Sequence, residues 1–259
     1  MVIYGSETPR PALVMSTVTQ RREKMITLKD GSKTGDIRLD RIKYFDKRSR
    51  GYPIRRMVAR KKMRSYTWRC NVQLDQGSEG ACVGFGVAHE LAARPSEVEG
   101  LSNKFAREAI YWEAQKIDEW KGGSYPGARP KYEGTSVLAG VKIARDKGFF
   151  DSFYWGFSMN DLALGVGYRG PAVLGLPWME GMFGTDARGY IHATGDGTGG
   201  HCILCRGVNV REKCFLLRNS WGRDWGVDGD CKISFADMEK LLADSGESVF
   251  FESRHTVAL

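Results

Sequence analysis

The sequence predicts an α+β fold in which helices come first and strands second. Apolar residues at helical spacing predominate in residues 82–147, whereas short apolar or alternating runs bounded by glycines predominate from residue 171. Because the two kinds of element are segregated along the chain, we expect two halves rather than alternating β and α units. A chain of 259 residues is long enough for one large domain or for two lobes that share a cleft.

Three helices are expected in the first half of the chain. The first begins near Cys82 and ends before Pro95, because proline cannot continue a helix. Almost all of its residues are apolar or small, which is typical of a helix buried on most faces. His89 lies two turns into this helix and is expected to be structural. Helical periodicity predicts the second helix over 102–120 and the third over 135–147.

The second half of the chain is expected to form mostly strands. Short runs that are apolar or alternating, and that glycines bound, are typical of strands. This pattern predicts strands at 171–178, 200–210, 214–219, 228–234 and 248–252. One helix is expected among them, at 235–242, and in the first half residues 67–74 look extended.

Three short stretches carry residues that can do chemistry. The first is QGSEGAC at 76–82, which places a cysteine at the first turn of a helix. The N-terminus of a helix carries about half a positive charge, and this field favours a thiolate and lowers the thiol pKa. The second stretch is GGHCIL at 199–204, and the third is LLRNSWG at 216–222. In chain order, the three stretches supply Gln, Cys, His and Asn.

This ordered set resembles the papain-like cysteine peptidases of the bacterial-type branch. QGSEGAC, GGHCIL and RNSWGRDWGVDG are similar to the family's glutamine-to-cysteine loop, its histidine strand and its asparagine-tryptophan turn. EGTSVLAGVKIARDKG and PAVLGLPW also look like that family, so the resemblance covers about residues 65–252. It implies a papain-like two-lobed fold, with a helical lobe followed by an antiparallel β-sheet lobe and an active site in the cleft between them.

The resemblance also implies a role for each residue of the set. Cys82 would attack a peptide carbonyl and form a thioester, with His201 as the acid and base. Gln76 and the backbone N–H of Cys82 would stabilise the oxyanion. Asn219 would orient the imidazole, and Trp221 would shield that contact from water. The expected protein is a thiol protease that hydrolyses polypeptide and needs no metal or cofactor.

The sequence departs from the family pattern near the expected substrate sites. Val83 stands where the family has an aromatic residue after the nucleophile. Gly134 is a single glycine where the substrate-aligning segment often has two, and Gly200 precedes the histidine, where the residue type often shapes a pocket. We expect Gly134, Gly200 and Trp221 to contact the substrate, but these departures leave the preferred substrate side chain open.

The other cysteines are expected to be buried thiols. With Cys82 as the nucleophile, five remain, an odd number that no complete set of disulfides can use. Secreted members of the family pair a cysteine three residues before the nucleophile, where this chain has Glu79. Cys202 and Cys205 form a C-x-x-C, but residues three apart on a strand face opposite sides and no second pair at ligand spacing follows. Metal binding is therefore not expected.

The positive charge of the protein is concentrated at its N-terminus. Residues 1–64 contain 18 Lys and Arg against 6 Asp and Glu, whereas the remainder is slightly acidic. We expect residues 1–64 to be a basic N-terminal extension and residues 65–259 to be the peptidase domain. Three hypotheses remain for the extension: a solvated arm, a contact with nucleic acid or another acidic surface, or an inhibitory segment like that of many papain-like peptidases.

No stretch of the chain reads as a membrane span or a signal peptide. No window of about 18 apolar residues occurs, and Pro9 to Pro11 interrupt the N-terminal stretch. A cytoplasmic location is expected. Two alternatives to an endopeptidase stay open: a catalytically silent papain-fold protein that docks through its basic segment, and an enzyme for isopeptide cleavage or acyl transfer.

Overall fold

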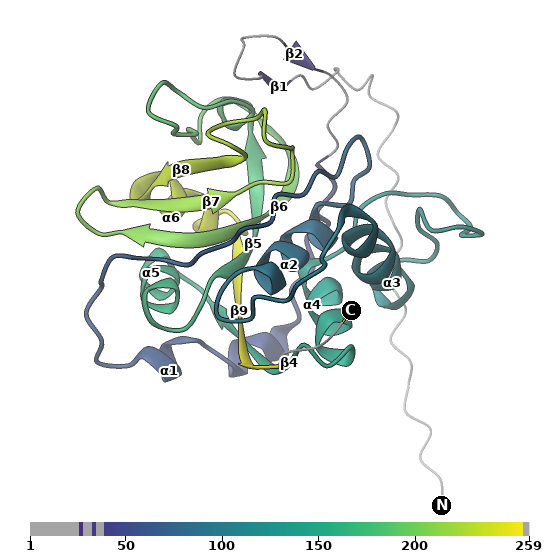
Figure 1. Ribbon diagram of the computed structural model, residues 1–259, viewed down its shortest axis with the longest axis horizontal. Coiled ribbons are helices and arrows are strands. Elements are labelled where there is room, and N and C mark those ends of the chain that lie inside the picture. Colours follow the sequence, from purple (N-terminus) through teal and green to yellow (C-terminus); the bar gives the residue numbers. More distant parts are fainter. Residues whose placement is uncertain (1–25, 28–32, 35–38, 256–258) are drawn as a thin grey trace, which may run out of the picture.

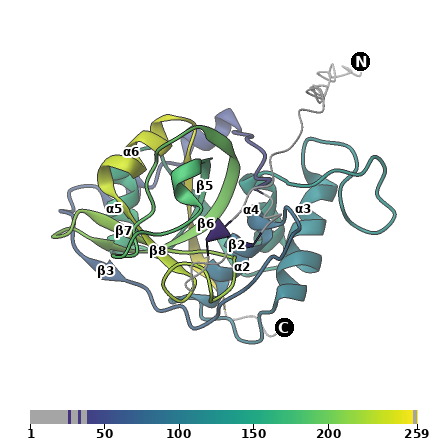
Figure 2. The ribbon, with the colours of Figure 1, turned by 90° about the horizontal axis from the view of Figure 1, so that it is seen from above.

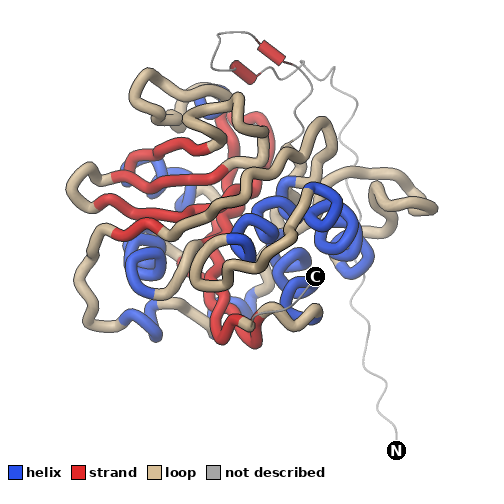
Figure 3. Tube along the Cα trace, in the orientation of Figure 1, coloured by secondary structure: helices blue, strands red, loops and turns tan. Residues whose placement is uncertain are grey.

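The fold consists of a helical lobe and a sheet lobe that lie side by side (Figure 1). The computed structural model describes residues 26–27, 33–34, 39–255 and 259. The helical lobe contains α2 (Cys82–Ala92), η2 (Phe105–Tyr111), α3 (Trp112–Ile117) and α4 (Val137–Asp146). Figure 3 shows this group of helices beside the strands. The predicted α+β fold with two lobes is confirmed.

The sheet lobe is built on one antiparallel sheet of seven strands. The strand order is β4-β9-β5-β6-β7-β8, and β3 pairs with β6. Two further strands, β1 (Ile26–Thr27) and β2 (Lys33–Thr34), pair separately. The strands of the large sheet are β3 (Tyr66–Thr67), β4 (Phe150–Gly156), β5 (Ala172–Met179), β6 (Gly197–Asn209), β7 (Cys214–Arg218), β8 (Asp230–Ser234) and β9 (Glu247–Arg254).

Alternate residues of the central strands enter two different cores. On β6, Ile203 and Cys205 join the core beneath α5 (Met159–Tyr168) and α6 (Phe235–Ala243), whereas Cys202 and Leu204 join the core shared with the helical lobe. Seen from above, α5 and α6 lie across the sheet from α3 and α4 (Figure 2). Since successive side chains of a strand point to opposite faces, the expectation that Cys202 and Cys205 face opposite sides is confirmed.

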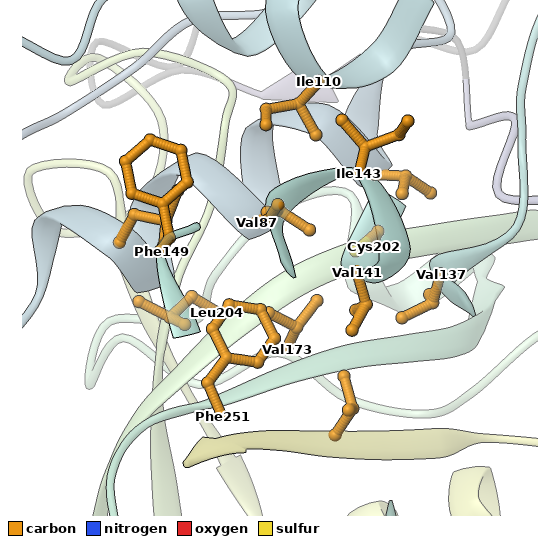
Figure 4. Close-up of a cluster of buried hydrophobic side chains, with 14 of the residues drawn as sticks. Val87, Ile110, Val137, Val141, Ile143, Phe149, Val173, Cys202, Leu204 and Phe251 are labelled. Atoms are coloured by element: carbon orange, nitrogen blue, oxygen red, sulfur yellow. The ribbon is translucent and has the colours of Figure 1, made fainter. Parts of the chain in front are cut away.

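The core between the lobes holds α2 tightly against β6. Side chains from α2, α4, β5, β6 and β9 meet in this core, which Figure 4 shows. Gly86 of α2 faces Cys202 of β6, and a Cβ added to Gly86 would lie 2.7 Å from Cys202 Sγ. A glycine is therefore required there, and the position of α2 against the sheet is fixed to within a small distance.

Residues 39–64 pack along the two lobes rather than lying apart from them. This segment includes η1 (Lys47–Gly51) and α1 (Arg55–Val58). Ile54 is fully buried, and its N–H donates to Trp155 O at 2.8 Å. Arg55 Nε donates to Asp161 Oδ1 at 2.7 Å. The division of the chain at residue 64 stays a prediction, with residues 39–64 in contact with the rest.

Several expected elements differ from the structure. The helix predicted over 102–120 is observed at 105–117, and its first seven residues are π-helical. Of the extended stretch at 67–74, only Thr67 belongs to a strand, because β3 pairs with β6 for two residues. Sequence patterns predicted neither β4 nor α5. Within the described part of the chain, no helix has the length and hydrophobicity needed to cross a bilayer.

The packing of residues 39–64 predicts a specific stability effect. Replacing Ile54 with Ala is expected to lower the free energy of unfolding by about 2–5 kcal/mol, because it leaves a cavity in a closed core. Met57→Ala is the matched control, since Met57 lies three residues away and is 39% exposed; its effect should stay within about 0.5 kcal/mol. Denaturant unfolding measures both, and equal effects would show that the segment does not pack as described.

Candidate active site

The candidate nucleophile lies at the start of α2, after a loop stabilised by backbone hydrogen bonds. Gly77 has a φ of +61°, and its N–H donates to Asp75 Oδ1 at 2.8 Å. A left-handed residue in a tight turn favours glycine. Ala81 caps the helix without a side-chain hydrogen bond. Cys82 follows as the first helical residue, at the positive end of the helix dipole.

Glu79 holds this loop by charge-assisted hydrogen bonds. Its carboxylate accepts from Arg107 Nε at 2.5 Å, from Trp112 Nε1 at 3.1 Å and from Ser124 Oγ at 3.0 Å. Two partners belong to the η2–α3 helix and one to the following loop. Glu79 therefore links the loop to the helical lobe at the position where secreted papain-like peptidases have a cysteine.

His201 and Asn219 come together across neighbouring strands. His201 lies on β6, Asn219 follows β7 directly, and these strands pair in antiparallel fashion. His201 Nε2 lies 2.8 Å from Asn219 Oδ1, which also accepts from Ser220 N–H at 2.8 Å. Since an amide oxygen only accepts, Nε2 must carry the proton. Nδ1 is buried without a hydrogen-bond partner among the described residues, and in neutral His201 it is the acceptor nitrogen.

Two tryptophan rings enclose the imidazole. The ring centroids of Trp221 and Trp178 lie 4.8 and 4.6 Å from that of His201. Both tryptophans are buried. Trp221 therefore occupies the place expected for a shield, and Trp178 is a second wall that sequence reasoning missed. In hindsight, pairing of strand 171–178 with the histidine strand would bring Trp178 near, because Leu176 pairs with His201.

Cys82 lies next to the strand that carries His201. Its sulfur accepts from the N–H of Cys202, the residue that follows His201. Cys82 is fully buried, and burial raises the pKa of its thiol to about 12. Burial also lowers the pKa of His201 to about 4, against the opposing effect of the hydrogen bond to Asn219.

Both groups are therefore neutral at pH 7 in this structure, as thiol and imidazole. The expectation that the helix terminus lowers the thiol pKa is not met in this state. Removal from water penalises the thiolate by more than the helix dipole and the hydrogen bonds to the sulfur favour it.

Gln76 joins the cysteine loop to the asparagine turn. Its Oε1 accepts from Ser220 Oγ at 2.7 Å, and its Nε2 donates to Glu79 O at 2.9 Å. Gln76 N–H also donates to Ser220 O at 2.9 Å. The structure thus brings Gln76 to the same site as His201 and Asn219, with Ser220 as a contact that the sequence did not indicate.

The cleft between the lobes is filled by the chain's own residues 39–42, here called the arm. Arg41 N–H donates to Gly200 O, and Ile42 N–H donates to Thr135 O, both at 2.9 Å. An added Cβ on Gly134 would lie 2.0 Å from Asp40 O, and one on Gly200 would lie 2.4 Å from Arg41 O. Both glycines expected to contact substrate therefore lie against the arm backbone.

The arm is anchored by a buried ion pair. Arg41 Nη2 and Nε donate to Glu247 Oε1 at 2.6 and 3.0 Å, and Nη2 also donates to Ser245 O at 3.1 Å. Arg41 and Glu247 are 6% and 5% exposed. Neither residue was singled out by the sequence, because one basic residue among many and one acid before a strand carry no local signal.

The remaining cysteines and His89 have structural surroundings. The five cysteines other than Cys82 are free and buried, as expected. His89 Nε2 accepts from Leu74 N–H at 3.1 Å, and burial lowers the pKa of this histidine to about 3. His89 therefore fixes the stretch before the cysteine loop, which confirms its predicted structural role.

Comparison with solved structures identifies the fold. Xylellain, a cysteine protease from Xylella fastidiosa, is similar over 92% of this chain and 100% of its own, with a TM-score of 0.64 and 16% sequence identity. Digestive procathepsin L 3 from Tenebrio molitor gives a TM-score of 0.52 at 16% identity, over 86% of this chain and 74% of its own. The proform of the ragweed pollen protease Amb a 11 gives a TM-score of 0.51 at 19% sequence identity, over 77% of this chain and 70% of its own.

Sequence comparison gives a weaker and local result. An uncharacterised peptidase C1-like protein of Acanthamoeba polyphaga mimivirus is 35% identical over 48 residues, which are 18% of this chain and only 15% of that relative. No family model matches the sequence. The structural likenesses, over most of the chain, show that this protein has the papain-like cysteine protease fold.

Proposed function

We propose that the protein is a cysteine endopeptidase that is held inactive by its own arm. The observation that carries the proposal is the hydrogen-bonded pair of His201 and Asn219 beside Cys82, with the arm bonded to Gly200, the residue before His201. The papain-like fold supports a peptidase in general. A thiol, an imidazole and an orienting amide at one cleft are the groups that acyl transfer requires.

The residues fit a two-step reaction. The Cys82 proton passes to His201 Nδ1, and the thiolate attacks the peptide carbonyl carbon to give a tetrahedral oxyanion. The Cys82 N–H and the Gln76 amide donate to this oxyanion. As the C–N bond breaks, His201 returns the proton to the leaving amine and a thioester remains. Water, deprotonated by His201, then hydrolyses the thioester and regenerates the thiol.

In this proposal, the arm keeps the site inactive because it closes the cleft over Cys82. A substrate carbonyl must reach the Cys82 sulfur, which is 0% exposed. The charges of Asp40 and Arg41 both act on the thiol, so the arm lies near the sulfur. When the arm leaves, the thiol and imidazole regain contact with water, and the penalty on their charged forms falls.

Replacing Arg41 with Ala in the full chain is expected to expose the nucleophile. Removing one partner of a buried ion pair costs about 3–5 kcal/mol while the other charge stays buried, and release of the arm relieves this cost. Labelling by an epoxide thiol inactivator at pH 7 should therefore become on the order of 100-fold faster. Intact mass and peptide mapping should find one modification, at Cys82, and casein should be hydrolysed.

Two variants on the Arg41→Ala background and one separate control test this assignment. Cys82→Ala should abolish labelling and hydrolysis, and His201→Ala should reduce both. Arg48→Ala is the matched control in an otherwise unchanged chain, because the Arg48 side chain is 84% exposed and pairs only locally with Asp46. If Cys82 in Arg41→Ala reacts no faster than the other five thiols and casein stays intact, the silent docking protein becomes the better interpretation.

Gln76→Ala separates oxyanion stabilisation from thiolate formation. On the Arg41→Ala background, it is expected to lower kcat for peptide hydrolysis by about 100- to 1000-fold, because one oxyanion donor is lost. Alkylation of Cys82 by iodoacetamide forms no oxyanion, so its rate should change by less than about tenfold. Equal losses in both assays would assign Gln76 to the structure of the loop instead.

The buried histidine also predicts a pH dependence of stability. His201 has its pKa lowered to about 4 in the folded chain, from 6.5 when unperturbed. Between these values the unfolded state binds the proton first, so the free energy of unfolding falls as pH falls below about 6.5. The contribution is about 1.4 kcal/mol per pH unit. Urea unfolding from pH 6 to 4.5 should show a shallower slope for His201→Gln, and identical slopes would contradict the assignment.

A further inference from the structure

A basic stretch without acidic residues lies on the sheet lobe. Residues 47–69 contain ten Lys and Arg and no Asp or Glu. Five of these basic side chains are exposed between residues 56 and 64 and are here called the basic surface: Arg56, Arg60, Lys61, Lys62 and Arg64. The first of them belongs to α1, which lies next to α5 at the edge of the sheet lobe (Figure 1).

Neighbouring carboxylates leave the charges of the basic surface uncompensated. Asp161 of α5 pairs with Arg55, which precedes the surface, at 2.7 Å. Glu212 follows β6, whose end contacts this part of the chain, and pairs with Lys232. Within the described part of the chain, none of the five residues of the basic surface forms an ion pair. Like charges gathered in this way create a positive potential that attracts a polyanion.

The loop between α1 and β3, which carries most of these charges, is held in place on α5. The Tyr168 hydroxyl donates to Lys62 O at 2.9 Å, and Arg64 Nε donates to Gly167 O at 2.5 Å. Arg60 has a φ of +66°. A residue other than glycine keeps this left-handed conformation only where its surroundings hold it. The charges of the basic surface therefore have fixed positions.

Arg64 is oriented to bind a phosphate group. Its guanidinium carbon lies 4.2 Å from the ring centroid of Tyr168 and 5.3 Å from that of Tyr66. Nε is bound to Gly167 O, whereas the two terminal nitrogens form no hydrogen bond to the residues that the structure describes. A planar guanidinium fixed in this way can donate both terminal N–H groups to one phosphate. Lys61 Nζ lies 5.5 Å from the Tyr168 centroid and places a second cation at the same ring.

Tyr66 offers an aromatic ring beside these cations. It is 40% exposed, and its ring centroid lies 4.5 Å from that of Trp68. Trp68 Nε1 donates to Val166 O at 2.7 Å, so the ring that supports Tyr66 is itself fixed. In proteins that bind single-stranded nucleic acid, cations follow the phosphates and bases stack on such rings. An anionic membrane also attracts cations, but its lipids have no planar base to stack on Tyr66.

We propose that the basic surface binds single-stranded nucleic acid, with the five cations on phosphates and a base on Tyr66. Binding at this surface does not require the proposed peptidase activity, because none of these residues belongs to the candidate active site. Each neutralised phosphate releases counterions, so the logarithm of the affinity should fall with the logarithm of the salt concentration. Five contacts to a single strand predict a slope of about −3.5.

The test measures binding of the full chain to a fluorescein-labelled oligonucleotide of about 16 deoxythymidines, which is as long as the larger known single-strand sites. Fluorescence anisotropy at pH 7 gives Kd over a series of salt concentrations. We expect Kd to rise on the order of 100-fold between about 50 and 200 mM salt. Absence of binding at the lower salt concentration would overturn the proposal.

A triple variant separates the basic surface from the net charge of the protein. Replacing Arg60, Lys61 and Lys62 with Gln should make the salt slope shallower by about 2, because three phosphate contacts are lost. The matched control replaces three exposed residues of the helical lobe with Gln: Lys104, Lys121 and Lys147. It removes the same charge and should keep the slope of the unchanged chain. Equal effects of the two triple variants would contradict a local site.

Tyr66→Leu tests whether the partner is a nucleic acid rather than another polyanion. It keeps an apolar side chain but removes the ring, so Kd for the oligonucleotide should rise about tenfold. Binding to heparin, which has no bases, should stay within about twofold. Tyr52→Leu is the control, because Tyr52 is 59% exposed and lies outside the basic surface; its Kd values should not change.

Two further outcomes would overturn the proposal. If Tyr66→Leu weakens binding to heparin and to the oligonucleotide equally, the ring does not stack on bases. If phosphatidylserine vesicles displace the oligonucleotide and bind Tyr66→Leu as tightly as the unchanged chain, the surface is a membrane contact. None of these measurements depends on hydrolysis, so failure of the proposed peptidase function would leave this surface standing, and the reverse also holds.

Discussion

The close packing of α2 on β6 is the constraint on which the candidate site depends. Gly86 lets the helix approach so closely that an added Cβ would lie 2.7 Å from Cys202 Sγ. One turn earlier on α2, the Cys82 sulfur then accepts from the Cys202 N–H, beside His201. A bulkier residue at Gly86 would push the helix away and separate Cys82 from His201, although neither residue would have changed. The distance between the lobes is therefore set by core packing rather than by the catalytic groups themselves.

Burial of Cys82 and His201 in the closed cleft determines the charge states of both side chains. A dry cleft disfavours both the thiolate of Cys82 and the imidazolium of His201, which is why their pKa values move away from neutrality in opposite directions. An ion pair of the two needs a cleft that water or substrate has entered. In the proposed function, the arm would thus act on the reaction in two ways, because it blocks access to the sulfur and keeps Cys82 and His201 uncharged.

Local sequence was sufficient to predict the candidate residues but not their surroundings. Cys82, His201 and Asn219 stand in short motifs whose local signals do not depend on the rest of the fold. Trp178 and Glu247 join the site only through strand register, since their closest site neighbours are 23 residues or more away along the chain. The π-helical start of η2 and the short pairing of β3 likewise reflect tertiary packing, which overrides local periodicity. The arm had the least local signal, because Arg41 is one of 18 basic residues in its segment.

The ion pair between Arg41 and Glu247 suits the proposed role of the arm, which is to hold its place in the inactive protein and to leave on activation. Burying two charges costs several kcal/mol of desolvation, and their attraction offsets this cost without a large surplus. A purely apolar contact of the same size would bind more tightly but would tolerate a shift in register. With the ion pair, by contrast, a shift in the register of the arm would separate Arg41 from Glu247, and a buried charge would remain unpaired. It therefore fixes which residue of the arm lies against Glu247 while contributing little net free energy to closure.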